Sequence, residues 1–143
     1  MLYARAFPHP GQPERKPALA IPTEPFRSAE QAWLWTMAAL LARHTGASRP
    51  GGCTPRPCEP DDIVLCLDSL YRRKRIDLTH ARVLRLWGER GCAPDGRLPA
   101  ERRETRLWAE AMELLDWPLR IRGIVVDLHT SRKIVVDNGV NRR

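Results

Sequence analysis

The sequence has no stretch that approaches the roughly 20 consecutive apolar residues that a membrane-spanning helix requires. It also has no apolar run of about 7 to 15 residues behind a basic N-terminus, the pattern typical of a secretory signal. We therefore expect no membrane partner and a cytoplasmic location. Thiols stay reduced in that compartment, so the four cysteines are expected to form no disulfides.

Signatures of catalysis are missing too. The sequence contains no Gly-x-Ser-x-Gly motif, no glycine-rich phosphate loop and no His-Glu-x-x-His motif. Cysteine and histidine both occur, but the spacing of Cys66, Cys92 and His80 does not indicate a nucleophile paired with a base. We therefore expect a protein that is not an enzyme and that uses no cofactor.

The second pair of closely spaced cysteines that structural zinc sites normally have is also absent. Cys53 and Cys58 flank a proline-rich loop with four residues between them, and His44 and Cys66 lie nearby in the sequence. Cys66 falls on an apolar helical face, where a thiol behaves as a small hydrophobic group. A zinc-stabilised module is a third hypothesis, and no metal-ligating residue is assigned.

The sequence does have apolar content and positive charge. Of its 143 residues, 43% are hydrophobic, enough for the core of one domain. The formal net charge is +7, a balance that favours anionic partners and nucleic acid first. The charge is clustered, because residues 70–90 hold seven basic and two acidic side chains whereas residues 60–69 hold three acidic and no basic ones.

The chain divides into three predicted parts. Six prolines in the first 25 residues exclude a helix there, so residues 1–26 are expected to form a disordered arm. Residues 27–123 are expected to form a compact domain of four to five helices, so the fold class is mainly α. The run Ile124–Asp127 recurs as Ile134–Asp137, which predicts a short β-hairpin or a frayed tail over residues 124–143.

Cap signals predict where the first two helices begin and end. Ser28, with Gln31 three residues later, forms a capping-box pattern, and Gly46 is a natural stop for that helix. A second helix is expected to begin at Pro60, whose missing N–H costs nothing at the first helical position. The cations of Arg72–Arg75 suit its C-terminal end.

The same kinds of cap signal predict two further helices. The third is expected to be capped by Asp77 or Thr79 and stopped by Gly91. The fourth and longest is expected to open at Pro99 and to break or kink at Pro118.

Apolar residues at helical spacing identify the expected inward faces. These are Trp33, Met37, Leu40, Leu41 and His44 in the first helix, Ile63, Cys66, Leu67 and Leu70 in the second, His80, Val83, Leu84 and Trp87 in the third, and Leu107, Trp108, Ala111, Leu114 and Leu115 in the fourth. The tryptophans of three stripes are expected to share one core. On such stripes, His44 and His80 are interpreted as hydrogen-bonded boundary histidines rather than catalytic bases.

Residues 60–90 have the sequence features of a helix-turn-helix, in which the second helix enters the major groove of DNA and the first crosses the backbone. The features are a turn of about three residues, a predicted shared core and a basic outward face on the second helix. The predicted nucleic-acid-binding residues are Arg72, Arg73, Lys74, Arg75, Arg82 and Arg85. The first four are expected to contact phosphates near the turn, and the last two to reach base edges.

The leading hypothesis is therefore a small regulatory or accessory protein that binds nucleic acid, with duplex DNA as the expected ligand. The alternative is a helical hairpin whose charged face meets only water, with Arg85 and Glu89 as a solvated ion pair. The protein would then be an interaction adaptor that uses Trp35, an exposed Leu65 or the C-terminal hairpin. A shared edge of that hairpin would also allow a homodimer.

Overall fold

The computed structural model describes residues 22–46 and 54–127. The helices within these ranges are α1 (Ala29–Thr45), α2 (Pro60–Arg72), α3 (Leu78–Arg90), a one-turn 3₁₀ helix η2 (Pro99–Glu101) and α4 (Arg102–Ile121). The expectation of a mainly α fold is confirmed for this part of the chain. None of these helices is long and apolar enough to cross a membrane.

Local sequence accounts for the ends of α1 and α3. The side chain of Ser28 accepts a hydrogen bond from the backbone N–H of Gln31 at 3.1 Å, and α1 ends at Gly46, whose φ is 72°. Asp77 caps the first turn of α3, and Gly91, with φ 77°, ends that helix. Glycine adopts this left-handed conformation without steric cost. The predicted boundary residues Ser28, Gly46, Asp77 and Gly91 are therefore confirmed.

The C-terminal end of α4 differs from the expectation. The sequence predicts a break or kink at Pro118; the break does not occur, because α4 continues through this proline to Ile121. Pro118 removes one N–H hydrogen bond from the last turn, and the next residue, Leu119, is fully buried and anchors that turn. Gly123, with φ 74°, then ends the helix, and the N–H of Ile124 donates to the carbonyl of Leu119 at 2.9 Å.

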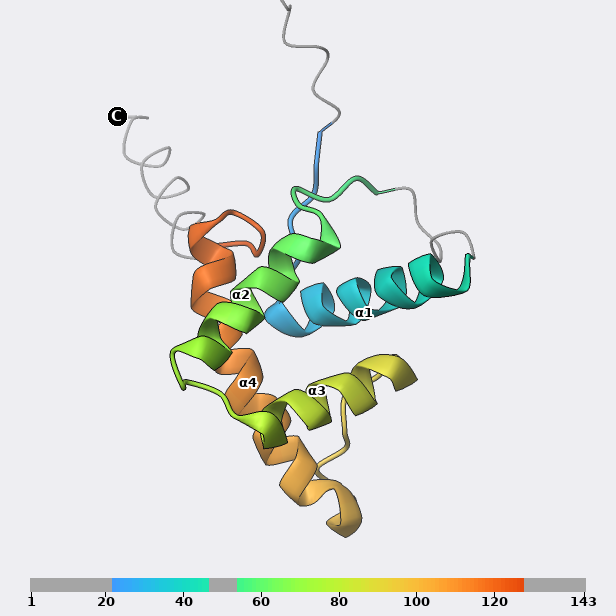
Figure 1. Ribbon diagram of the computed structural model, residues 1–143, viewed down its shortest axis with the longest axis vertical. Helices are drawn as coiled ribbons and strands as arrows, with labels where there is room; N and C mark the ends of the chain where they lie inside the picture. The colour runs from blue at the N-terminus through green and yellow to red at the C-terminus, as the bar shows by residue number, and fades with distance from the viewer. Residues whose placement is uncertain (1–21, 47–53, 128–143) are drawn as a thin grey trace, which may run out of the picture.

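Helix α1 occupies the centre of the domain. It lies between α2 and α3, and α4 packs across all three (Figure 1). Helices α2 and α3 are joined by a turn but do not pack on each other. Because α1 has a neighbour on two sides, its buried face is made largely of small residues: Ala29, Ala32, Thr36, Ala39 and Ala42.

The small residues of α1 explain one error in the predicted core. Leu41 and His44 are expected on the inward face but are exposed. In the last turn of α1 only Ala42 is buried, because small side chains rather than the leucine stripe let the neighbouring helices approach. Trp33 and Met37, by contrast, are buried as expected.

Three buried tryptophans connect the helices in a cycle. The indole N–H of Trp33 in α1 donates to a backbone carbonyl of α3 at 3.0 Å. Trp87 in α3 donates to the carboxylate of Glu104 in α4, and Trp108 in α4 donates to Glu30 in α1 at 2.8 Å. Each ring therefore buries its apolar surface with its N–H paired, and the predicted shared tryptophan core is confirmed.

The segments that flank the helices meet at one edge of the core. The N–H of Phe26 donates to the carbonyl of Ile124 at 2.8 Å, and the N–H of Val126 donates to the carbonyl of Phe26 at 2.9 Å. This parallel bridge places Phe26, Ile124 and Val125 in the core. The last residue of the predicted arm and the first of the predicted hairpin are thus packed together. Residues 1–21 of the predicted arm and residues 128–143 of the predicted hairpin or tail, which include the repeat at 134–137, lie outside the described residues.

Candidate nucleic-acid interface

The candidate interface is built around the turn after α2, residues Arg72–Arg75, here called the cationic turn. The N–H of Arg75 donates to the carbonyl of Leu70 at 2.9 Å, and that of Lys74 donates to Tyr71 at 3.0 Å. These two bonds form a Schellman motif, in which Lys74 takes the left-handed position with φ 59°. Glycine favours this position, and a lysine there costs about 1 kcal/mol.

The turn directs its cations to two different hollows. Arg72 and Lys74 line a hollow of about 730 Å³ that also includes Tyr71, Leu78 and Arg82, here called the Tyr71 hollow. Its other lining residues are Ile76, Asp77 and Thr79. The Tyr71 hollow thus combines three cations with exposed apolar side chains.

Arg73 and Arg75 line a second hollow of about 1050 Å³, between the turn and the C-terminal half of α4. It is here called the Trp117 groove, and its α4 wall includes Glu110, Glu113 and Trp117. The six predicted binding residues are thus divided between the two hollows, except for Arg85, which lines neither.

All six predicted binding residues are exposed, but two of them are already paired. Arg72 forms an ion pair with Asp68 at 3.0 Å, and Arg85 forms one with Glu89 at 3.1 Å. Of these six, Arg73, Lys74, Arg75 and Arg82 form no ion pair with a described residue. Arg90, which the charge count includes, lies over the ring of Trp87 at 4.6 Å from its centroid.

The packing of α2 and α3 differs from the expected helix-turn-helix arrangement. The predicted shared core of the pair, which includes Ile63, Leu67, Leu84 and Trp87, belongs to one cluster. The two helices reach that cluster by packing on α1 and α4 rather than on each other. In a helix-turn-helix the two helices of the pair pack on each other. The corresponding contact between α2 and α3 is not present.

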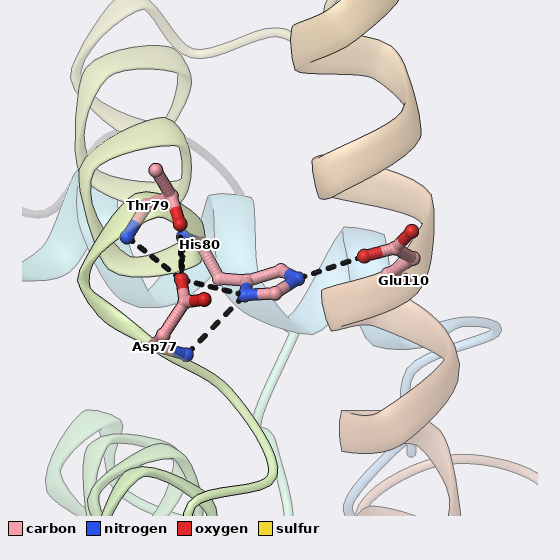
Figure 2. A network of polar contacts seen from close by, with 4 residues as sticks. All are labelled: Asp77, Thr79, His80 and Glu110. Atoms are coloured by element: carbon pink, nitrogen blue, oxygen red, sulfur yellow. Dashed lines mark hydrogen bonds and ion pairs between the residues drawn. The ribbon is translucent and has the colours of Figure 1, made fainter.

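Asp77 fixes the start of α3 (Figure 2). Its carboxylate accepts hydrogen bonds from the N–H groups of Thr79, at 2.9 Å, and His80, at 3.2 Å, and from the Thr79 hydroxyl. These bonds, that of the hydroxyl first, lower the pKa of Asp77 to about 2. Asp77 is therefore ionised at neutral pH and committed to the helix cap.

His80 connects this cap to α4 (Figure 2). Its Nε2 lies 2.9 Å from the carboxylate of Glu110, and the N–H of Asp77 donates to its Nδ1 at 3.3 Å. Nδ1 also lies 3.1 Å from the carboxylate of Asp77, so the imidazole joins the carboxylates of Asp77 and Glu110. The side chain is only 12% exposed, so the interpretation of His80 as a hydrogen-bonded boundary residue is confirmed.

The three thiols within residues 54–127 show no arrangement typical of a metal site. Burial, with the nearby carboxylates Asp62 and Glu59, raises the pKa of Cys58 to about 11, and burial also raises the pKa of Cys66. Among the described residues, no group of three or more histidine, cysteine or acidic side chains is placed to hold a metal ion. Cys53, the other cysteine of the predicted zinc pair, lies outside them.

The residues named for a protein-binding role lie in different environments. Trp35 is half-buried, and its ring packs against Phe26 with centroids 5.1 Å apart. Leu65 is 59% exposed, as its position in the sequence predicts. Trp117 is the most exposed large apolar side chain of the described residues, at 69%.

Tyr71 lies among the predicted binding residues, although the sequence prediction does not include it. This side chain is 44% exposed and lies directly beside the cationic turn. The sequence signal is an aromatic residue immediately before four consecutive cations, a combination of side chains typical of nucleic-acid-binding surfaces.

Comparisons of the chain with protein-family models, with curated proteins and with solved structures found no match.

Proposed function

We propose that this protein binds nucleic acid through phosphate contacts at the cationic turn, in a role without catalysis. The observation that supports this proposal is that four of the six predicted cations, Arg73, Lys74, Arg75 and Arg82, lie close together, are exposed and form no ion pair with a described residue. Three of them are consecutive and the fourth lies one turn into α3. A chain of closely spaced phosphates offers a partner for each.

The proposal makes a quantitative claim about salt. Each phosphate contact releases condensed counterions, so the logarithm of the binding constant falls linearly with the logarithm of salt concentration. Four contacts correspond to a slope of about −3 to −4. A partner bound through apolar contacts would show a much smaller slope.

Fluorescence anisotropy with labelled mixed-sequence DNA, at salt concentrations from about 50 mM upward, tests this claim. We expect Arg73→Ala to weaken binding to all sequences alike and to reduce the magnitude of the slope by about one. Arg103→Ala is the matched control, because Arg103 is also exposed but lies at the start of α4, outside both hollows. Absence of binding at about 50 mM salt, or equal losses in both variants, would contradict the proposal.

The finer part of the proposal is the regulatory role on duplex DNA that the sequence predicts. Such a role requires sequence preference, which Arg82 and Arg85 would supply through base contacts. Because Arg85 is paired with Glu89, we expect Arg82→Ala to reduce discrimination between duplexes more than Arg85→Ala does. Competition between duplexes of different sequence measures this difference.

An interaction adaptor is the second candidate function. The observation that favours it is the exposed pair of Trp117 and Ile121 on α4, beside the Trp117 groove. Binding to a protein through such side chains would persist at high salt and would be lost in Trp117→Ala. Salt-resistant binding of this kind, without salt-sensitive binding to DNA, favours the adaptor.

A further inference from the structure

The Tyr71 hollow has an apolar side as well as a charged one. Tyr71 is 44% exposed and Leu78 is 57% exposed, and both line the hollow together with Lys74 and Arg82. An exposed apolar surface of this kind costs free energy in water unless a partner covers it. Phosphate contacts alone do not cover it.

The form of nucleic acid decides whether the apolar side is used. In a duplex the base faces are stacked on one another, so a surface that binds the backbone meets only sugars and phosphates. In a single strand the base faces are free to stack on aromatic side chains, while the phosphates follow neighbouring cations. A tyrosine between cations therefore matches a single strand better than a duplex.

We infer that the nucleic acid bound at the cationic turn is single-stranded, with one base stacked on Tyr71 and its flanking phosphates on Lys74 and Arg82. This inference rests on the proposed phosphate contacts at the cationic turn, and it names a single strand as the ligand in place of the duplex DNA that the sequence predicts. Lys74 and Arg82 have no ion-pair partner among the described residues, so both are available to phosphates. Asp77, the acidic residue of the hollow, is directed to the N–H groups of α3.

The Trp117 groove is the natural comparison, because it also combines an exposed aromatic side chain with two cations. Its wall, however, includes Glu110 and Glu113. These carboxylates oppose a polyanion close to Trp117, and Glu110 is exposed even though it contacts His80. The charge around Tyr71 is therefore the better complement to a nucleic-acid strand.

The test compares three labelled probes of equal length: a single-stranded oligonucleotide, the same strand with a run of abasic sites, and a duplex. The abasic strand keeps its phosphates and loses the bases, so it separates stacking from charge. We expect the intact strand to bind about 5- to 150-fold more tightly than the abasic one, the range for stacking of one base. We also expect it to bind more tightly than the duplex at the same salt concentration.

Variants locate the stacking surface. Tyr71→Ala should remove the difference between the intact and abasic strands, and Tyr71→Phe should keep it because the ring remains. Trp117→Ala is the matched control and should leave the difference unchanged. Thermal unfolding tests whether the variants are folded. We expect them to be, because Tyr71 is partly exposed and its replacement leaves the core unchanged.

The outcomes separate this inference from the proposed function. Equal, salt-sensitive binding of intact and abasic strands would overturn the inference and leave the phosphate-binding proposal standing. A loss of the difference in Trp117→Ala but not in Tyr71→Ala would also overturn it. No binding of any probe at about 50 mM salt would contradict both.

Discussion

Lys74 combines a backbone cost with an exposed charge. It takes the left-handed position of the Schellman motif, where glycine is most favourable. We expect Lys74→Gly to raise the free energy of unfolding by about 1 kcal/mol, because the steric cost is removed, and at the same time to weaken binding to nucleic acid. Chemical denaturation and anisotropy measure the two effects. A variant that is less stable, or that binds as the wild type does, would contradict this account of Lys74.

The cap residue Asp77 predicts a dependence of stability on pH. Its pKa is about 2 in the folded protein and near 3.8 when the cap is absent, so folding favours the ionised form. The stability that this preference contributes is complete above the higher value and is lost as the pH falls through about 2.

Asp77→Asn isolates that contribution, because asparagine also caps helices but does not titrate. Between pH 5 and pH 2, thermal unfolding should show a larger fall in Tm for the wild type than for the variant. Parallel curves would show that Asp77 is not held in its ionised form by the cap.

The thiols are expected to differ in reactivity. Because the pKa of Cys58 is about 11 and Cys66 is buried, both should be mostly protonated and slow to alkylate at neutral pH. Of the three cysteines within residues 54–127, Cys92 is the exposed one and should react first. Peptide mapping after brief treatment with iodoacetamide measures the three sites separately, and faster alkylation of Cys58 than of Cys92 would contradict the packing of the loop before α2.

At the scale of elements, the sequence predicts helix ends better than helix neighbours. Ser28, Gly46, Asp77 and Gly91 act on their own backbone, so their effects can be read without the rest of the fold. The separation of α2 from α3 by α1 depends instead on small residues on two sides of α1, a pattern that leucine and tryptophan periodicity obscures. For this reason the helix-turn-helix arrangement predicted for the pair is not confirmed.

The contact between α1 and α3 depends on Gly88. A Cβ atom at this position would lie 2.5 Å from Cγ of Met37 and 3.1 Å from Nε1 of Trp33. We expect Gly88→Ala to lower the free energy of unfolding by about 1–3 kcal/mol, because overpacking outweighs the better helix propensity of alanine.

A double-mutant cycle checks this cause. Met37→Ala removes the Cγ atom that the new side chain would meet, so the two substitutions together should cost less than the sum of their separate costs. Additive costs in chemical denaturation would show that Gly88 is not the point of closest approach.

At the scale of the whole molecule, the sequence shows where the positive charge lies but not which of the cations are already in ion pairs. The excess of cations in residues 70–90 is evident from composition. Which of them are paired depends on neighbours one helical turn away, as Arg72 with Asp68 and Arg85 with Glu89 show. The two hollows depend on the Schellman turn and on the position of α4, which no local pattern specifies.

A titration of ¹⁵N-labelled protein with an unlabelled oligonucleotide, followed by amide NMR shifts, tests the central claim most directly. The account predicts that the largest shifts fall in residues 71–82, around the cationic turn and the start of α3, and that added salt reverses them. The cations at the start of α4, Arg102, Arg103 and Arg106, provide the internal comparison. Largest shifts at those residues or around Trp117, or no shifts at all, would contradict the proposal that the cationic turn is the nucleic-acid-binding site.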